Sequence, residues 1–287
     1  MKIRSYAKIN IGLDVIRRLD NGYHEVRMIM QSLGLCDELT VDRTDERGIT
    51  ITVSDPDLPT GEDNLIYKAA KLMIDEFGLP GGLSVHLTKN IPVAAGLAGG
   101  SGNAAAVMKA VNKLYDLGLT SGDLCKRGVK IGADVPFCIM GGCAVSEGIG
   151  EVLTPITPLK DCSIVLAKPP VSVSTAYVYN NLRLDEVIHP DIDAIIAGIK
   201  TGDIRQVMDN LGNVLETVTG PQYPIIGRIE QIMKECGALG AMMSGSGPTV
   251  FGIFDTAEAA NKACDELKKT DESLRLFVTE AIGPVEI

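Results

Sequence analysis

The stretch Pro92-Val-Ala-Ala-Gly-Leu-Ala-Gly-Gly-Ser-Gly-Asn-Ala-Ala-Ala106 lies between two segments with different hydrophobic periods. Before it, residues 83–87 alternate apolar and polar side chains, which predicts a strand. After it, apolar residues recur at helical spacing, namely Ala104, Val107, Met108, Val111, Leu114 and Tyr115. We therefore expect a strand, a glycine-rich loop and a helix, with Ser101 or Asn103 as the helix cap. The free N–H groups at such a helix start favour an anion, above all a phosphate.

The glycine-rich loop matches neither of the two best-known phosphate-binding patterns. A Walker loop needs Gly-Lys-Ser/Thr at the helix start, and no lysine lies there. A dinucleotide-binding loop needs Gly-x-Gly-x-x-Gly, whereas this one is Gly-x-x-Gly-Gly-x-Gly. Glycines let a ligand approach the backbone closely, but they also form turns that are purely structural. The loop alone leaves both interpretations open.

Length and composition limit the class of protein. At 287 residues the chain can form two hydrophobic cores, and 45% apolar with 22% charged residues is typical of a globular protein. The formal net charge of −10 argues against binding to nucleic acid or to an anionic membrane. The apolar runs are shorter than the roughly 20 residues that span a bilayer. No signal peptide precedes the first strand-like segment, so we expect a cytoplasmic protein.

The cysteines and histidines do not form a metal-binding pattern. Seven cysteines are scattered along the chain without a Cys-x-x-Cys pair, and three histidines have no ligand spacing. We expect reduced, mostly buried thiols and no protein metal site.

The first residues predict a long hairpin. Residues 2–15 alternate as a half-buried strand that carries Lys8 and Asn10 on one face. Asp20-Asn21-Gly22 predicts a tight turn into a second strand over residues 26–35, with Tyr23 and His24 near its tip. A solvated strand lysine and an amphipathic hairpin edge are the plainer interpretations of these residues.

The rest of the first half predicts more strands and short helices. Residues 39–53 predict two strands split by Arg47-Gly48, and a helix runs from Asp63-Asn64 to Phe77. Thr120-Ser-Gly-Asp123 predicts a capping box for a short helix that ends near Ile131. Asp134 follows in a tight bend, where it could be a simple turn aspartate, and residues 143–147 predict a closing strand.

A proline-rich break at residues 154–158 predicts the boundary between a domain of residues 1–155 and one of residues 156–287. In the second part, strands are predicted over residues 163–167, 239–243, 250–254 and 276–282, and helices over residues 192–199, 204–211 and 225–236 and from Asp255 to Lys268. Ser244-Gly-Ser-Gly-Pro248 is a second glycine loop. Together these segments predict an α+β or split βαβ sheet layer.

Three stretches in this order resemble the GHMP kinase superfamily: Ala7-Lys-Ile-Asn10, the loop from Pro92 to Ser101, and the late Ser244-Gly-Ser-Gly loop. Within it, Ala7-Lys-Ile-Asn-Ile-Gly-Leu13, Asp20-Asn-Gly-Tyr-His-Glu25 and Gly132-Ala-Asp-Val-Pro136 resemble the branch that acts on a cytidyl-linked sugar alcohol. The resemblance runs from the first predicted strand to the last.

The resemblance implies a fold and an activity. The fold is an α+β, two-domain GHMP kinase fold, with an N-terminal domain like the second domain of ribosomal protein S5 and a ferredoxin-like C-terminal domain. The activity is transfer of the ATP γ-phosphoryl group, with Mg²⁺ carried by ATP, to the 2-hydroxyl of 4-diphosphocytidyl-2-C-methyl-D-erythritol in non-mevalonate isoprenoid biosynthesis. Partners other than this small-molecule substrate are not expected, and the chain is expected to be a monomer or a weak homodimer.

The resemblance also implies roles for individual residues. Asp134 matches the catalytic aspartate and Lys8 the catalytic lysine. The ATP-binding positions are Asn64, Leu65, Lys89, Pro92, Gly96, Leu97, Ala98, Gly99, Gly100 and Ser101. The substrate-binding positions are Asn10, Tyr23, His24, Thr175 and Tyr179, with Tyr179 preferred over Tyr177 as the aromatic side chain that closes over the base.

One departure from the family pattern concerns the loop. Gly102 stands where a second serine is common, which implies one hydroxyl fewer near the phosphates, and a serine restored there is expected to be tolerated. Two alternatives remain: another GHMP kinase of the homoserine or mevalonate type, which has no base to hold, and a non-catalytic nucleotide sensor, which needs neither Lys8 nor Asp134.

Overall fold

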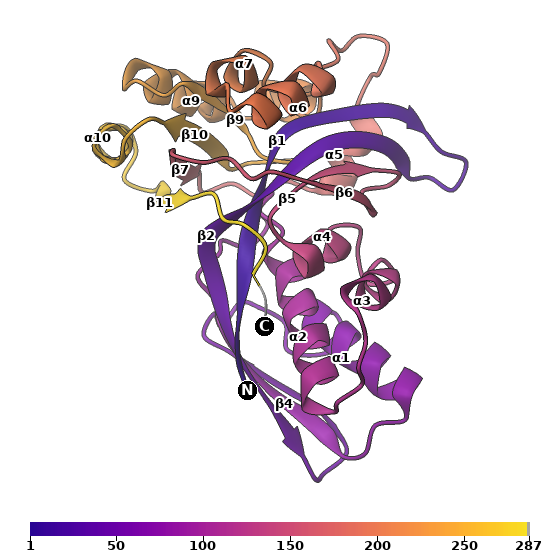
Figure 1. Cartoon of the computed structure of the whole chain (residues 1–287). Helices are drawn as coiled ribbons and strands as arrows, with labels where there is room; N and C mark the ends of the chain where they lie inside the picture. The colour runs from indigo at the N-terminus through magenta and orange to yellow at the C-terminus, as the bar shows by residue number, and fades with distance from the viewer. Residues whose placement is uncertain (286–287) are drawn as a thin grey trace.

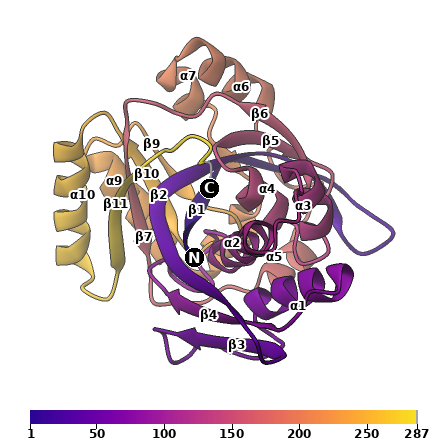
Figure 2. The same ribbon diagram turned by 60° about the horizontal axis from the view of Figure 1, so that its bottom comes forward.

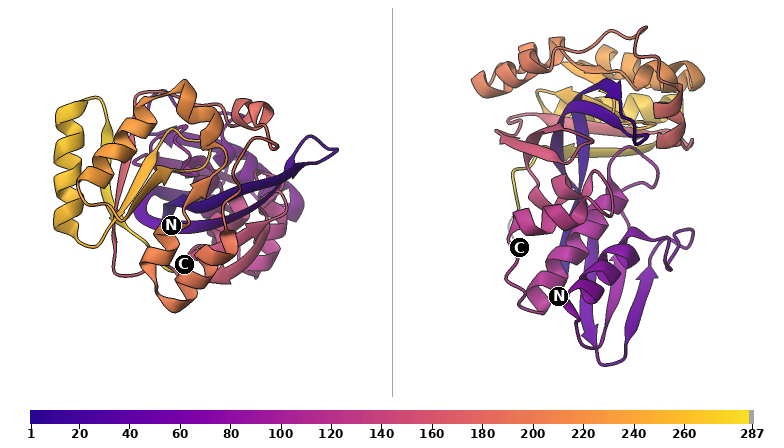
Figure 3. Two further views of the ribbon diagram at one scale, coloured as in Figure 1. Left: turned by 90° about the horizontal axis from the view of Figure 1, so that it is seen from above. Right: turned by 90° about the vertical axis from the view of Figure 1, so that its right-hand side faces the viewer.

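Two long antiparallel strands, β1 (Lys2–Arg18) and β2 (His24–Thr44), run through the whole molecule and belong to both of its halves (Figure 1). The computed structural model describes residues 1–285. Figure 3 shows in two further views that the turn between these strands projects beside the C-terminal half, while their other ends reach the far end of the N-terminal half. The hairpin predicted from Asp20-Asn-Gly22 is confirmed, and β2 pairs with β1 along most of its length.

The N-terminal half is a seven-stranded sheet covered by helices (Figure 2). Its strand order is β3 (Gly48–Val53), β4 (Gly82–Thr88), β2, β1 and β8 (Gly212–Asn213), while β5 (Cys143–Glu147) pairs with β2 and with β6 (Val152–Ile156). The helices are α1 (Leu65–Phe77), α2 (Gly99–Leu114), α3 (Ser121–Gly128) and α4 (Val135–Met140). Apolar residues of α1 and α2 pack on Leu39, Val41, Val85 and Leu87 of the sheet.

The C-terminal half is built on a four-stranded sheet with the order β11-β7-β10-β9. These strands are β7 (Ser163–Lys168), β9 (Gly240–Met243), β10 (Val250–Phe254) and β11 (Arg275–Glu280). The helices are α5 (Thr175–Asn181), α6 (Ile192–Thr201), α7 (Ile204–Asp209), α8 (Glu216–Gln222), α9 (Ile225–Glu235) and α10 (Ala257–Thr270). Both halves together confirm the predicted α+β fold.

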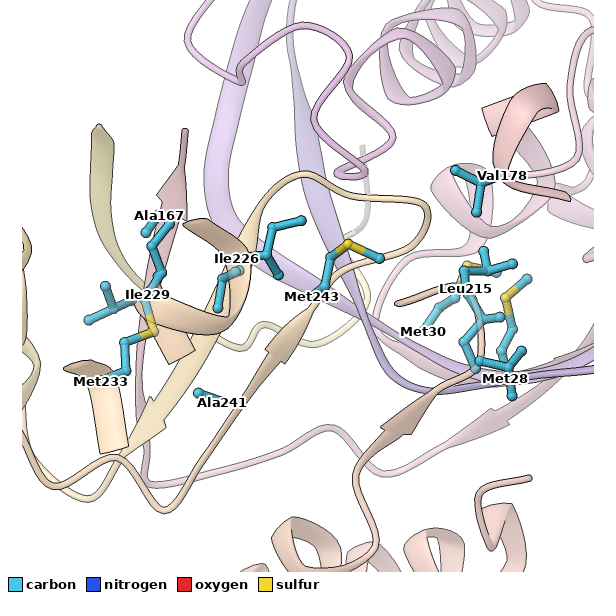
Figure 4. Packing of buried hydrophobic residues seen from close by; sticks show 14 of the residues in the cluster. Met28, Met30, Ala167, Val178, Leu215, Ile226, Ile229, Met233, Ala241 and Met243 are labelled. Atoms are coloured by element: carbon cyan, nitrogen blue, oxygen red, sulfur yellow. The ribbon is translucent and has the colours of Figure 1, made fainter. Parts of the chain in front are cut away.

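Both faces of the C-terminal sheet are buried, and this joins the halves. One face packs against α9 and α10, where Ile226, Ile229 and Met233 meet Ala167 and Met243 (Figure 4). The other face packs against β1 and β2, where Ile164, Leu166 and Phe251 meet Ile9, Ile11 and Ile29. Strand β1 is therefore buried on both faces from Ala7 to Val15, and the expected half-buried strand is wrong for this part. The register shifts after Tyr6 and after Asn10, which allows Lys8 and Asn10 to be directed into the site described below.

Several local predictions are confirmed. Asn64 caps α1 and Gly78 ends it in the left-handed conformation, and Thr120 and Asp123 form the predicted capping box of α3. All seven cysteines are free, as expected, but the expectation that most are buried is wrong, because only Cys143 is fully buried and the other six are partly exposed. In residues 1–285 no helix has the length and apolar character needed to cross a bilayer.

Other predictions are wrong, mostly where distant contacts decide the structure. The strands expected at residues 26–35 and from residue 39 are one continuous strand, β2, because β1, β4 and β5 pair with successive parts of it. Helix α2 begins at Gly99 after Ala98, so neither Ser101 nor Asn103 caps it. The helix expected from Asp255 begins at Ala257, with Thr256 as its N-cap.

Three helices that were not expected are present: α4 directly after Asp134, α5 and α8. The proline-rich break contains the strand β6, which pairs with β5 up to Ile156. Strand β7 begins only at Ser163, and the division into residues 1–155 and 156–287 stays a proposal.

Candidate active site

A cavity of about 940 Å³ lies between the two halves. Its walls come from β1, the β1–β2 turn, the start of α1, the glycine-rich loop, the start of α4, α5 and the late glycine loop. Every residue that the sequence analysis assigned to the site lines this cavity: Lys8, Asn10, Tyr23, His24, Asn64, Leu65, Lys89, Pro92, Gly96, Leu97, Ala98, Gly99, Gly100, Ser101, Asp134, Thr175 and Tyr179. Lys8 and Tyr179, which are 171 positions apart in the sequence, thus line the same space, and its size suits a small-molecule ligand.

Lys8 and Asp134 face each other in this cavity. The Lys8 Nζ lies 3.7 Å from the Asp134 Oδ2, and the two side chains are 6% and 31% exposed. Lys8 also donates a 2.7 Å hydrogen bond to the Asn10 Oδ1, and the Asn10 Nδ2 donates to the Met28 sulfur. The lysine is thus held by two oxygens, while part of the carboxylate stays open to the cavity. Such a pair can accept a proton and stabilise negative charge next to it.

Asp134 owes its place to the helix that follows it. It is the N-cap residue of α4, with Pro136 in the first turn of the helix. Proline is well tolerated there because its missing N–H would have had no partner. The predicted bend is therefore a helix start, and α4 packs on α2 and α3 in the core.

The glycine-rich loop leads into α2 with unusual backbone angles. Ala94 and Ala98 have φ of 50° and 54°, and Gly96 has φ of 73°. A Cβ at Gly96 would lie 2.2 Å from the Ser244 carbonyl oxygen, so only glycine fits between the two loops. From Gly99 onward the first N–H groups of α2 have no partner within the helix. They line the cavity and form a ready site for phosphate groups.

The late glycine loop is fastened to the first one and to the substrate side. The Ser244 hydroxyl donates to the Gly96 carbonyl at 3.1 Å. The buried Asn213 amide donates to the carbonyls of Met243 and Gly245 at 2.9 and 2.8 Å. The hydroxyls of Ser246 and Thr175 lie 2.9 Å apart, which connects this loop to α5.

A buried carboxylate, Asp37, anchors the base of the glycine-rich loop. It is fully buried and accepts hydrogen bonds from the Lys89 Nζ at 2.6 Å, from the N–H groups of Asn90 and Ile91 at 2.7 and 2.8 Å, and from the Asn103 amide at 2.8 Å. Burial lowers the pKa of Lys89, and the charge of Asp37 opposes that shift. Asp37 therefore joins the strand before the loop to the helix after it.

Aromatic side chains from both halves meet in the wall of this cavity. The ring centroids of His24, at the start of β2, and Tyr179, on α5, lie 5.1 Å apart with planes tilted by 38°. Burial raises the pKa of Tyr179 and lowers that of His24, so both rings favour their neutral forms. Tyr23 also lines the cavity and is 57% exposed, whereas Tyr177 is not among the lining residues.

The structure corrects the expectation for Gly102. A Cβ at this position would point away from the cavity and toward β1. It would lie 2.5 Å from the Ser5 hydroxyl and 3.3 Å from the Tyr6 carbonyl oxygen. The missing side chain at Gly102 therefore leaves no gap in the wall of this cavity. The Ser101 hydroxyl faces the segment before Asp134, because a Cβ at Gly132 would lie 3.9 Å from it.

Sequence reasoning did not select several residues of this site. Asp37, Asn103 and Asn213 anchor its loops, and Gly245 and Ser246 line its wall. An acidic residue between the apolar residues of Leu35-Cys-Asp-Glu-Leu39 was the available signal for a buried, partnered carboxylate. Asn213 lacks such a signal, since its partners belong to another loop.

Two families match this chain by sequence. The GHMP kinases N terminal domain matches residues 64–142, which include the glycine-rich loop, α2 and Asp134. The GHMP kinases C terminal family matches residues 195–272, which include the late glycine loop.

Relatives with high identity cover nearly the whole chain. A protein of Lachnospira eligens is 49% identical over 99% of this chain and 99% of its own length, and one of Lachnoclostridium phytofermentans is 48% identical over 97% of this chain and 96% of its own length. Both are named 4-diphosphocytidyl-2-C-methyl-D-erythritol kinase.

Comparison with solved structures points to the same family. A crystal structure of 4-(cytidine 5'-diphospho)-2C-methyl-D-erythritol kinase has a TM-score of 0.83 at 31% identity, covering 99% of this chain and 100% of that one. The homoserine kinase from Cytophaga hutchinsonii has a TM-score of 0.79 at 21% identity, covering 98% of this chain and 95% of that one, and shows the shared fold alone. The chain therefore belongs to the GHMP kinases and, within them, to the family of the 4-diphosphocytidyl-2-C-methyl-D-erythritol kinases.

Proposed function

We propose that the chain transfers the γ-phosphoryl group of ATP to the 2-hydroxyl of 4-diphosphocytidyl-2-C-methyl-D-erythritol. One observation carries this proposal: the Lys8–Asp134 pair lies in the same cavity as the N-terminus of α2 and as an aromatic pair from both halves. Relatives at 48–49% identity that carry the name of this activity support the choice of substrate. The reaction belongs to isoprenoid precursor biosynthesis.

ATP binds with its phosphates at the start of α2. The N–H groups from Gly99 onward and the positive end of the helix dipole attract the phosphate oxygens. The adenosine lies toward Asn64, Leu65 and Lys89, on the same side of the cavity. The fully buried Asp37 holds this part of the loop in place, so little ordering remains to be done when ATP binds.

Asp134 and Lys8 act on the acceptor hydroxyl. Asp134 accepts the hydroxyl proton, and Lys8 stabilises the charge that develops on the transferred group and its neighbours. Phosphoryl transfer depends mainly on such positioning and electrostatic stabilisation. A buried lysine held at 2.7 Å by Asn10 supplies a charge whose position is already set before the substrate arrives.

The donors in the cavity fit a magnesium ion that arrives with ATP. Among residues 1–285 no group of three or more acidic, histidine or cysteine side chains could hold a metal ion by itself. Magnesium often binds through one or two protein oxygens together with substrate phosphates, and the Ser101 hydroxyl is the protein oxygen beside the start of α2. When bound, the ion would neutralise part of the phosphate charge.

The cytidyl group lies at the aromatic side of the cavity. Tyr179 stacks on the base from the C-terminal half, Tyr23 approaches from the β1–β2 turn, and His24 donates or accepts at the base edge. Thr175 and Asn10 hold the remainder of the substrate. A kinase for a bare amino acid or a small acid would need no aromatic surface here. The predicted monomer or weak homodimer and the cytoplasmic location stay predictions.

A coupled ADP-release assay with three acceptors tests this proposal. The cytidyl substrate, homoserine and mevalonate are offered separately at equal concentration, with a reaction without acceptor as the control for ATP hydrolysis. We expect kcat/KM for the cytidyl substrate to exceed the other two by at least about 10³-fold, because unpaired polar groups in the pocket reject an acceptor that lacks their partner. Higher activity with homoserine or mevalonate would overturn the proposal.

A further inference from the structure

A second cavity, of about 610 Å³, lies on another face of α2. Gly102, Ala106, Lys109 and Lys113 line it, and their spacing places them along one face of this helix. The remaining walls are the first residues of β1, the end of α4 and the chain from Ile282 to Val285. Figure 1 shows both ends of the described chain beside α2, in agreement with this lining. No residue that we assign to the ATP or substrate site lines this cavity.

The C-terminal wall of this cavity is fixed to the N-terminal half. The Ile282 N–H donates to the Ser32 carbonyl at 3.0 Å, and the Gln31 amide donates to the Ile282 carbonyl at 2.9 Å. Gly142 leaves just enough room for Pro284, since a Cβ there would lie 2.8 Å from the proline Cδ. The cavity is therefore enclosed by a segment with defined partners.

The charge of this cavity differs from that of the whole chain. Lys2, Arg4, Lys109 and Lys113 line it, and no aspartate or glutamate is found among its described lining residues. The chain as a whole carries 37 acidic and 27 basic residues. Arg4 has an acidic neighbour, Glu38, at 3.7 Å between the Nε and the Oε1. A cluster of one sign in an acidic protein concentrates anions from solution.

Lys109 is more buried than the other three cations, which are exposed. It is half-buried, and within the described chain the titratable groups that act on it are the thiols of Cys138 and Cys125, with no carboxylate among them. Burial lowers the pKa of Lys109, and the two thiols oppose that shift only in part. An anion in the cavity would supply the missing counter-charge. The floor next to it is apolar, formed by Phe137, Ala106 and Ile3.

We propose that this cavity is a binding site for a small organic anion with an apolar body. Lys109 and Lys113, which lie on one face of α2, hold the anionic group, and the apolar body lies on Phe137 and Ala106. The volume is within the range of cavities that bind small molecules, and a few polar groups around an apolar floor are typical of such sites. Phosphate and carboxylate head groups share the required chemistry. The site is independent of the substrate that we propose for the active site.

Calorimetric titration with hexyl phosphate tests this inference. The protein is first saturated with ADP and Mg²⁺, so that the phosphate-binding site at the start of α2 is filled. Hexanoate tests a carboxylate head group, inorganic phosphate tests the head group alone, and hexanol tests the apolar body alone. We expect binding of hexyl phosphate or hexanoate, with hexanol and inorganic phosphate at least about tenfold weaker, since each lacks one half of the interaction.

Variants assign the binding to this cavity. Lys109→Met combined with Lys113→Met should weaken binding by about tenfold or more, whereas Lys109→Arg, which keeps the charge, should retain it. Lys262→Met, on the exposed face of α10, is the matched control and should bind like the unchanged protein. Thermal unfolding of each variant shows that it is folded.

Three results would overturn the inference: no binding of either anion, equal binding by the Lys109→Met/Lys113→Met protein, or loss of binding when ADP is present.

Discussion

Lys8 shows how a charged side chain is kept inside this fold. The residue is only 4% exposed, and an unpaired ammonium group at so buried a position would cost several kcal/mol. The Asn10 oxygen at 2.7 Å and the Asp134 carboxylate at 3.7 Å offset that cost. The sequence placed Lys8 and Asn10 on one face of a strand, but the burial of both faces follows from the C-terminal sheet packed against β1.

At this scale we predict the effect of Asp134→Asn. The variant keeps the shape of the side chain and removes its ability to accept a proton, so turnover should fall by about 10²–10⁴-fold. The protein should still fold, because the side chain is 31% exposed and makes no cap hydrogen bond to α4, but loss of the charge 3.7 Å from Lys8 should lower its stability. Steady-state kinetics and thermal unfolding are the measurements. A folded variant with turnover near that of the unchanged protein would remove Asp134 from the mechanism.

At the scale of the element, α2 carries three kinds of contact on different faces. Its start lines the large cavity, Asn103 reaches the buried Asp37, and Gly102 lies against Ser5 of β1. The helix is therefore fixed on both sides before any phosphate arrives.

We predict that Gly102→Ser destabilises the protein by about 1–3 kcal/mol, the usual cost of an added group in a packed site. The new Cβ would lie 2.5 Å from the Ser5 hydroxyl, to which Asn103 donates a hydrogen bond. The double variant Ser5→Ala/Gly102→Ser removes that hydroxyl and should recover most of the loss. Urea unfolding of both variants measures this. If Gly102→Ser alone is as stable as the unchanged protein, β1 and α2 are less tightly packed here than described.

We predict that Asp37→Asn costs about 3–5 kcal/mol, because Lys89 would keep a buried charge without its partner. The double variant Asp37→Asn/Lys89→Met has no such charge and should regain much of the stability. Urea unfolding and the KM for ATP should be measured on both. An Asp37→Asn protein with unchanged stability and unchanged KM for ATP would contradict the anchoring role of this carboxylate.

Local sequence signals were enough to predict where some helices begin. The lengths of some strands and the burial of polar residues depend on contacts between distant residues, so the sequence did not predict them. The caps Asn64 and Thr120 act within a few residues of themselves, so the starts of α1 and α3 could be predicted. The length of β2 depends on pairing with β1, β4 and β5, and the burial of Asp37 depends on donors 52 and 66 residues away. The candidate site could be named because its motifs are specific to a family. Its anchoring residues could not, because their partners become neighbours only in the fold.

In the whole molecule, the substrate side of the site is shared by the two halves. His24 comes from the β1–β2 hairpin and Tyr179 from α5, and their ring centroids lie 5.1 Å apart. Removal of either ring therefore opens the cavity at the junction.

We predict that Tyr179→Ala raises the Kd for the cytidyl substrate by roughly 5- to 150-fold, because stacking of a base on an aromatic ring is worth about 1–3 kcal/mol. The Kd for ATP should change little. Tyr177→Ala is the matched control from the same helix, since Tyr177 is 48% exposed and does not line the cavity.

Calorimetry with each ligand and the melting temperature of both variants are needed, because Tyr179 also packs on the C-terminal core. Equal losses for both ligands would mean that Tyr179 is structural, and a selective loss with Tyr177→Ala would assign the stacking to the other tyrosine.

Phosphorus NMR of the completed reaction tests most directly which atom receives the phosphoryl group. The 2-carbon of the proposed substrate bears a methyl group and no hydrogen, so a phosphate on its oxygen gives a new monoester signal without three-bond proton splitting. The account predicts this unsplit signal, formed in step with ADP, from the cytidyl substrate. A signal split by neighbouring protons would place the phosphate on another hydroxyl, and ADP formed without any new monoester would mean hydrolysis of ATP; either result would contradict the account.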